Sequence, residues 1–131
     1  MKKTKVEIVG MILVMLMIFL QGGYGILAYI DPLYFSNVRG TELFSINDSD
    51  WVTIYGSRTL FIALFLGVLL YFRNYRVLMW CALLSIIMPV TDGILAYQAQ
   101  VPLKVVMKHV LTTIYIIVTF FVLKKIVSKP N

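Results

Sequence analysis

Long apolar runs separated by short polar segments dominate this chain, and the pattern occurs four times along its 131 residues. A helix that crosses a bilayer needs about 20 consecutive, mostly apolar residues. Four segments meet this length, so the pattern predicts transmembrane helices at about 6–30, 51–72, 77–97 and 103–127. The whole chain, residues 1–131, is expected to form one domain, an all-α four-helix transmembrane bundle.

The composition agrees with a membrane protein rather than a soluble one. Hydrophobic residues make up 60% of the chain and charged residues only 14%, whereas ordinary soluble domains are about 45–50% apolar. A soluble fold this small needs a polar surface over most of its area. The lipid bilayer is therefore the first partner that the sequence predicts.

The basic excess does not indicate a nucleic-acid-binding protein. The formal net charge is +6, but the Lys and Arg residues lie at the helix ends rather than along one face. Cys81 is the single cysteine and His109 the single histidine, which leaves too few ligands for a zinc or haem site. We expect no metal, no cofactor and no disulfide within the chain.

The placement of basic residues predicts the orientation in the membrane. If the spans alternate, eight of the twelve basic residues fall on one side: Lys2, Lys3, Lys5, Arg73, Arg76, Lys124, Lys125 and Lys129. The loop at 31–50 has one Arg and four acidic residues. By the positive-inside rule both termini face the cytoplasm and this loop faces outward, in a bacterial cytoplasmic membrane.

The first apolar segment could instead be a signal peptide, because a basic stretch precedes it. No A-x-A-like cleavage site follows and the apolar run is long, so we prefer a retained helix.

The outer loop at 31–50 is unusually apolar for a free connection. It contains Tyr34, Phe35, Leu43, Phe44 and Ile46. We expect it to fold back over the bundle mouth or to lie in the membrane interface; a solvated linker is the alternative.

Three ionisable residues in three spans lie at similar depth. Arg58, Asp92 and His109 are about 10, 8 and 9 Å below the outer boundary, at about 1.5 Å of rise per residue. Ionisable residues inside a membrane usually face the bundle interior. We therefore predict an Arg58–Asp92 pair with His109 beside it. The alternatives are an ion pair that only fixes helix register and an ordinary hydrogen-bonded core histidine rather than a proton carrier.

The first span meets this level at the stretch QGGYG. Gln21 and Tyr24 would add polar groups to the cluster, while Gly22, Gly23 and Gly25 would allow close backbone approach or leave a space. Plain helix packing is the alternative for the glycines.

Two features of the later spans bear on the same level. Pro89 cannot donate to the Ser85 carbonyl and is expected to kink its helix, helped by Gly93, so that Asp92 points inward. On the fourth span a polar stripe could line a channel or bond neighbouring helices: Lys108, Thr112, Tyr115 and Thr119. Thr112 joins the predicted cluster, whereas Lys108 is shallow enough to snorkel outward.

Several of these motifs are similar to a known group. YGSR opens the second span, the basic turn RNYR follows it, PVTDG lies late in the third span and a His early in the fourth. From about Tyr55 to Val110 the chain resembles small four-helix membrane proteins related to the DoxX-like group. The resemblance maps onto five positions: Gly56, Arg58, Pro89, Asp92 and His109. It implies a compact four-helix bundle and, for some relatives, quinone-coupled oxidation.

The leading functional hypothesis is a binding or accessory protein with an outward-facing polar pocket for a lipid, a quinone or another small amphiphile. The alternative is a small proton-coupled transporter, perhaps dimeric, since such proteins use a membrane carboxylate. An enzyme comes third, because no nucleophile, phosphate loop or metal set accompanies Asp92 and His109. A second copy of the chain or another membrane protein are the protein partners that these hypotheses allow.

Overall fold

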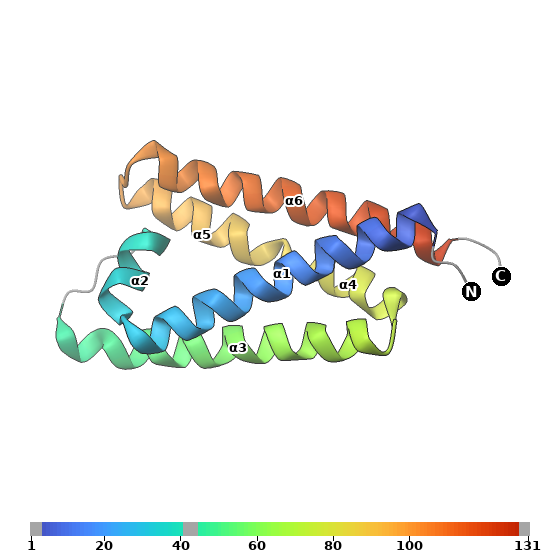
Figure 1. Cartoon of the computed structure of the whole chain (residues 1–131). Coiled ribbons are helices and arrows are strands. Elements are labelled where there is room, and N and C mark those ends of the chain that lie inside the picture. The colour runs from blue at the N-terminus through green and yellow to red at the C-terminus, as the bar shows by residue number, and fades with distance from the viewer. Residues whose placement is uncertain (1–3, 41–44, 129–131) are drawn as a thin grey trace.

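The computed structural model describes residues 4–40 and 45–128, and every regular element in those ranges is helical (Figure 1). The order is α1 (Lys5–Ile30), α2 (Pro32–Arg39), the 3-10 turn η1 (Ile46–Asp48), α3 (Ser49–Tyr71), α4 (Tyr75–Ser85), α5 (Ile87–Gln98) and α6 (Leu103–Val127).

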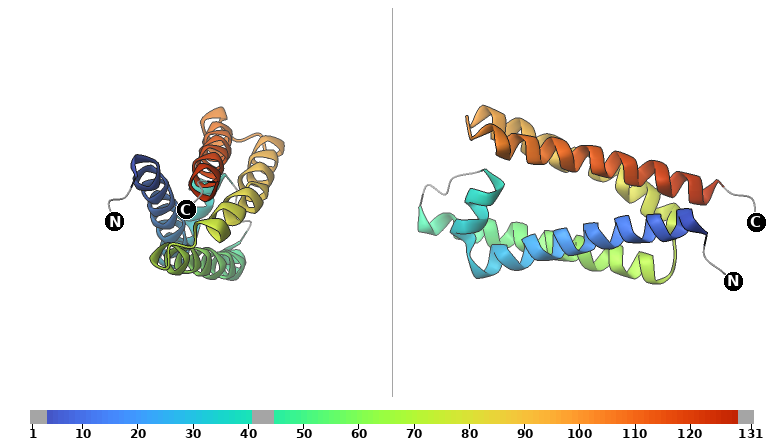
Figure 2. Two further views of the ribbon diagram at one scale, coloured as in Figure 1. Left: turned by 90° about the vertical axis from the view of Figure 1, so that its right-hand side faces the viewer. Right: turned by 45° about the horizontal axis from the view of Figure 1, so that its top comes forward.

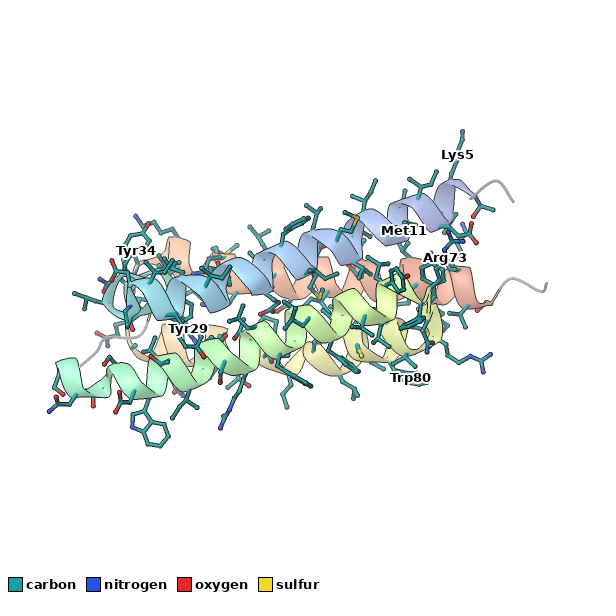
Figure 3. All side chains as sticks on the ribbon, turned by 60° about the horizontal axis from the view of Figure 1, so that its bottom comes forward. Lys5, Met11, Tyr29, Tyr34, Arg73 and Trp80 are labelled. Atoms are coloured by element: carbon teal, nitrogen blue, oxygen red, sulfur yellow. The ribbon has the colours of Figure 1, made fainter. Side chains whose placement is uncertain are left out.

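Four helical segments are long and apolar enough to cross a membrane: α1, α3, the combined α4–α5 segment and α6. The predicted all-α bundle of four transmembrane helices is therefore confirmed, and the bounds differ from those expected by at most two residues. Only 17% to 22% of the most apolar window of each span is buried within the chain. The apolar side chains that project from the helices on all sides must then face lipid (Figure 3).

The helices form two packed groups. The helix α1 lies along α3, while α6 lies along α4 and α5, and α1 also contacts α6 (Figure 2). The start of α1 and the end of α6 lie together at one end, which we call the terminal end; the opposite end, which holds α2, we call the α2 end (Figure 1). That the terminal end faces the cytoplasm stays a prediction. Three of the eight basic residues behind this prediction lie outside the described residues: Lys2, Lys3 and Lys129.

Small residues bring α1 and α3 into close contact near the α2 end. A Cβ atom added to Gly56 would lie 2.9 Å from the Cβ of Ala28, and one added to Gly25 would lie 3.1 Å from the Gly56 carbonyl oxygen. Small residues let membrane helices approach closely and gain van der Waals contact. The packing alternative thus describes Gly25, and Gly56 is its counterpart on α3.

The core in the middle of the bundle is mainly apolar; the buried Thr119 donates its hydroxyl to the Tyr115 carbonyl within α6. Its buried side chains come from all four spans: Val14, Met17, Leu66, Leu78, Met79, Ala82, Ile116 and Leu123. Ion pairs are not needed to hold this part of the bundle together.

The third span is interrupted before its proline. The helix α4 ends at Ser85 and α5 begins at Ile87, two residues before Pro89 (Figure 1). Proline has no N–H to donate to the carbonyl four residues earlier, which here is that of Ser85. At the break between the two helices, the Ile86 amide donates to the Leu83 carbonyl, three residues earlier, at 3.4 Å. The irregularity expected around Pro89 therefore occurs where its missing hydrogen bond would have reached.

Part of the outer loop folds back as α2. The Oδ1 atom of Asp31 accepts a hydrogen bond from the Tyr34 amide at 2.9 Å and caps the helix, a common role for aspartate. Gly40 ends the helix with a φ of 90°, a left-handed conformation that favours glycine. Phe35 and Ser36 are only 3% and 2% exposed, so α2 packs into the bundle mouth. Of the other apolar loop residues, Leu43, Phe44 and the side chain of Ile46 lie outside the described part.

Candidate functional site

A cavity of about 60 Å³ lies at the α2 end, where α2 meets α1, α3, α5 and α6. Its polar lining residues are Gln21, Tyr24, Arg39, Tyr55, Asp92, Lys108, His109 and Thr112. Its apolar lining residues are Leu20, Phe35, Met88, Pro89 and Ile116. At about 1.5 Å of rise per residue, Asp92 lies about 9 Å inside the last residue of α5, so the cavity lies within the length of the membrane-spanning segments.

Arg39, at the end of α2, connects three helices. Its Nη2 atom donates to Oδ1 of Asp92 on α5 at 2.5 Å, and the two side chains are only 23% and 17% exposed. The guanidinium carbon also lies 3.9 Å from the ring centroid of Tyr55 on α3. A charge-assisted hydrogen bond and a cation–π contact, both largely out of water, therefore hold α2 in place.

Two basic residues of α6 meet the carbonyl end of α2. The Nζ atom of Lys108 donates to the Val38 carbonyl. Nε2 of His109, whose side chain is buried, lies 3.1 Å from the Arg39 carbonyl oxygen; because a carbonyl only accepts, Nε2 carries a hydrogen. The last carbonyls of a helix lack partners within the helix and favour nearby positive charge. Lys108 supplies a positive charge, and Lys108 and His109 each supply a hydrogen-bond partner for one of these carbonyls.

Aromatic rings line the side of the cavity next to α1 and α3. Phe35 of α2 packs between Tyr24 of α1, with ring centroids 6.0 Å apart, and Tyr55 of α3, at 5.5 Å. Such contacts add to the energy of burial. They bring two tyrosine side chains to the cavity.

The predicted Arg58–Asp92 pair is wrong, because the partner of Asp92 is Arg39. Arg58 is exposed and does not line the cavity. The inward face of α3 carries its buried residues: Gly56, Thr59, Ala63 and Leu66. Each residue turns a helix by about 100°, so Arg58, next to Thr59, points away from that face. Depth alone does not decide which side chains meet; the helix face must match as well.

Five of the predicted cluster residues do line the same cavity: Gln21, Tyr24, Asp92, His109 and Thr112. Pro89 lines it too. Gly22 and Gly23 do not, since they line an apolar groove on the outer side of α1 and α3. A Cβ on Gly93 would lie 3.3 Å from the Cβ of His109, so this glycine allows α6 to approach α5.

Sequence reasoning missed Arg39, Tyr55 and the inward position of Lys108. Lys108 was expected to snorkel outward, but its side chain turns to α2. The usable signal was in the outer loop, where one arginine follows an apolar stretch at 33–35.

The cavity offers hydrogen-bond donors and an excess of basic groups. Arg39, Lys108 and His109 stand against a single carboxylate, Asp92, among the described lining residues. Every buried side-chain nitrogen and oxygen in the described part of the chain has a hydrogen-bond partner. The site is thus internally satisfied, while its basic groups and tyrosines can still turn to oxygen atoms of a ligand.

Comparison with known proteins gives one match. A family model described as "Domain of unknown function (DUF4267)" matches residues 16–123. No curated protein and no solved structure matches the chain. The match shows no link to the DoxX-like group, so that resemblance stays a prediction. The matched segment spans all four membrane helices in whole or in part and contains every cavity residue from Leu20 to Ile116. Since it covers well over half of the chain, this protein belongs to the family described as "Domain of unknown function (DUF4267)".

Proposed function

We propose that this small multi-pass membrane protein binds the polar head group of a small amphiphile, such as a lipid or a quinone, in the cavity at the α2 end. The observation that carries the proposal is the convergence of Arg39, Asp92, Lys108 and His109 on one cavity within the length of the membrane-spanning segments. Ionisable residues are costly there and commonly mark a functional site.

The charge balance supports a head group rich in oxygen acceptors. The single carboxylate is engaged by Arg39. The side chains of Lys108 and His109 form hydrogen bonds with carbonyl groups of α2. A phosphate or carboxylate would be a stronger acceptor for these groups than the helix end, because hydrogen bonds to a charged acceptor are stronger than those to a neutral carbonyl. A quinone carbonyl would instead take the place of a helix carbonyl as a neutral acceptor.

The size of the cavity limits what can enter. A volume of about 60 Å³ corresponds to roughly four to six water-sized sites, at about 10–15 Å³ each. Pockets that enclose whole drug-sized ligands measure about 300–1,000 Å³. Only a head group therefore fits inside, and the apolar tail would leave past Leu20, which lines the cavity and is 39% exposed, into the lipid.

The transporter alternative has less support. A proton-exchanging carboxylate must gain and lose its charge, whereas Asp92 is ion-paired with Arg39 in a largely buried site.

The test is photo-crosslinking in nanodiscs with two probes, a diazirine-bearing fatty acid and a short-chain azidoquinone. Peptides that contain residues 20–24 and 88–92 should carry the label of at least one probe. Lys108→Met should reduce this labelling several-fold. The matched control is Lys104→Met, which removes an exposed lysine one turn earlier on α6 that does not line the cavity.

Two results would count against the proposal. One is labelling spread evenly over the lipid-facing surface with both probes; the other is an equal loss in the two lysine variants. Proton flux into proteoliposomes that disappears in Asp92→Asn would favour the transporter instead.

A further inference from the structure

A second, separate groove lies at the terminal end, between the start of α1 and the end of α6. It measures about 400 Å³ and is lined by Lys5, Val6, Val9, Val118, Phe121, Val122 and Lys125. The two lysines are exposed, and Lys5 projects outward at the terminal end of the bundle (Figure 3). No residue of the cavity at the α2 end takes part.

The groove is polar at one end and apolar along the rest. Because α1 and α6 run in opposite directions, Lys5 on α1 and Lys125 on α6 both fall at the terminal end (Figure 1). From there the lining on α6 continues inward to Val118, seven residues away, or about 10 Å at 1.5 Å per residue. Val9 and Phe121 are 46% and 59% exposed, so the apolar part is open to lipid.

No acidic side chain neutralises the two lysines within the described residues. The nearby Glu7 caps α1, where its Oε2 atom accepts a hydrogen bond from the Thr4 amide at 2.7 Å. The ion pair between Arg39 and Asp92 at the other end of the bundle is the only one in the described part. The polar end of the groove is therefore positively charged, and an anion would complement it.

We propose that this groove binds an acidic phospholipid, with its phosphate between Lys5 and Lys125 and one acyl chain along the valines. The positive end of the groove matches the anionic head group of such a lipid, and the apolar remainder of the groove matches its hydrocarbon chain. Basic pockets between membrane helices bind acidic lipid head groups in this manner.

Native mass spectrometry tests the proposal with the full chain in mixed micelles that contain equal amounts of phosphatidylglycerol and phosphatidylcholine with identical acyl chains. A lysine near an anionic lipid strengthens its binding by about fivefold. The wild-type protein should retain phosphatidylglycerol over phosphatidylcholine by roughly 25-fold if both lysines contribute.

The matched variants separate the groove from general charge. Lys5→Gln with Lys125→Gln should remove the preference, whereas Lys124→Gln should keep it, because Lys124 is equally basic but does not line the groove. Val118→Trp, which fills the apolar part, should lower retention of both lipids. Lys108→Met in the other cavity should change nothing here, so this proposal and the proposed function can fail independently. Equal retention of the two lipids by the wild type would overturn the proposal. So would an equal loss of the lipid preference in the two single variants, Lys124→Gln and Lys125→Gln.

Discussion

Replacing Arg39 by methionine should release α2 from the bundle mouth while leaving the four membrane helices packed. Arg39 joins α2 to α5 through its ion pair with Asp92 and to α3 through its cation–π contact with Tyr55. Methionine keeps an apolar stem of similar reach but removes the charge, the donors and the cation–π contact. The apolar core in the middle of the bundle contains no residue of α2.

The size of the effect follows from the burial of the ion pair. Removing one partner of a buried pair costs about 3–5 kcal/mol. Arg39 and Asp92 keep 23% and 17% exposure, and Lys108 lines the same cavity as a substitute cation, so we take about 2–3 kcal/mol. The lost contact with the Tyr55 ring adds about 1 kcal/mol. The docking of α2 should weaken by about 3–4 kcal/mol in total.

Hydrogen–deuterium exchange in nanodiscs measures this docking directly. A loss of about 3 kcal/mol corresponds to a fall of roughly 100-fold in the protection of α2 amides. Amides in the middle of α6 should keep their protection. Asp92→Asn should cost less, about 2 kcal/mol, because the neutral amide can still accept a hydrogen bond from Arg39. The double variant should show a coupling energy of about 2 kcal/mol between the two positions.

The matched control is Arg58→Met, which removes the exposed arginine of α3. It should leave the protection of α2 unchanged and show no coupling with Asp92→Asn. If Arg58→Met exposes α2 as strongly as Arg39→Met does, or if only Arg58 couples to Asp92, the assignment of the ion pair is refuted.

Three further substitutions, the first with a matched control, test a helix contact, a backbone conformation and a hydrogen bond. Gly56→Ala should destabilise the bundle by about 1–3 kcal/mol in an SDS unfolding titration, because the new Cβ would lie 2.9 Å from that of Ala28. The control Gly67→Ala, whose new Cβ has no atom within 4 Å, should be neutral or slightly stabilising. Equal effects of the two substitutions would refute the close contact. Gly40→Ala should reduce α2 protection at a cost of about 1–2 kcal/mol, since this position has a φ of 90°; unchanged exchange would contradict it. Tyr115→Phe removes a hydroxyl that donates to a carbonyl of α1 and should cost about 1 kcal/mol of unfolding free energy, whereas no change would show that the bond contributes nothing.

The spans were predictable from the sequence because hydrophobic length is a strong and local signal. A run of about 20 apolar residues has few stable alternatives, since a membrane leaves no water for the backbone groups. The break before Pro89 follows from the missing N–H of proline alone. Each of these inferences needs only residues that are close together in the chain.

The ion pair could not be predicted in the same way, because it joins residues 53 positions apart. Depth arithmetic compared only residues within spanning helices, and so it found Arg58. It could not include a residue that reaches the same level by folding back from the loop, as Arg39 does. A helical-wheel test would have removed Arg58, since Thr59 and Gly56 occupy the inward face. Choosing Arg39 in its place requires knowing where α2 ends.

The α2 end of this bundle, with its polar cavity, and the apolar middle play different physical roles. A buried ion pair contributes little net stability compared with well-packed apolar residues, and the middle of the bundle already packs without one. If α2 had only to close the bundle mouth, Phe35 and other apolar side chains would do so at lower cost. Instead α2 is held through Arg39 and through carbonyls bonded to Lys108 and His109. Polar bonds of this kind can be exchanged for bonds to a ligand without exposing apolar surface, which favours a binding site over a plug.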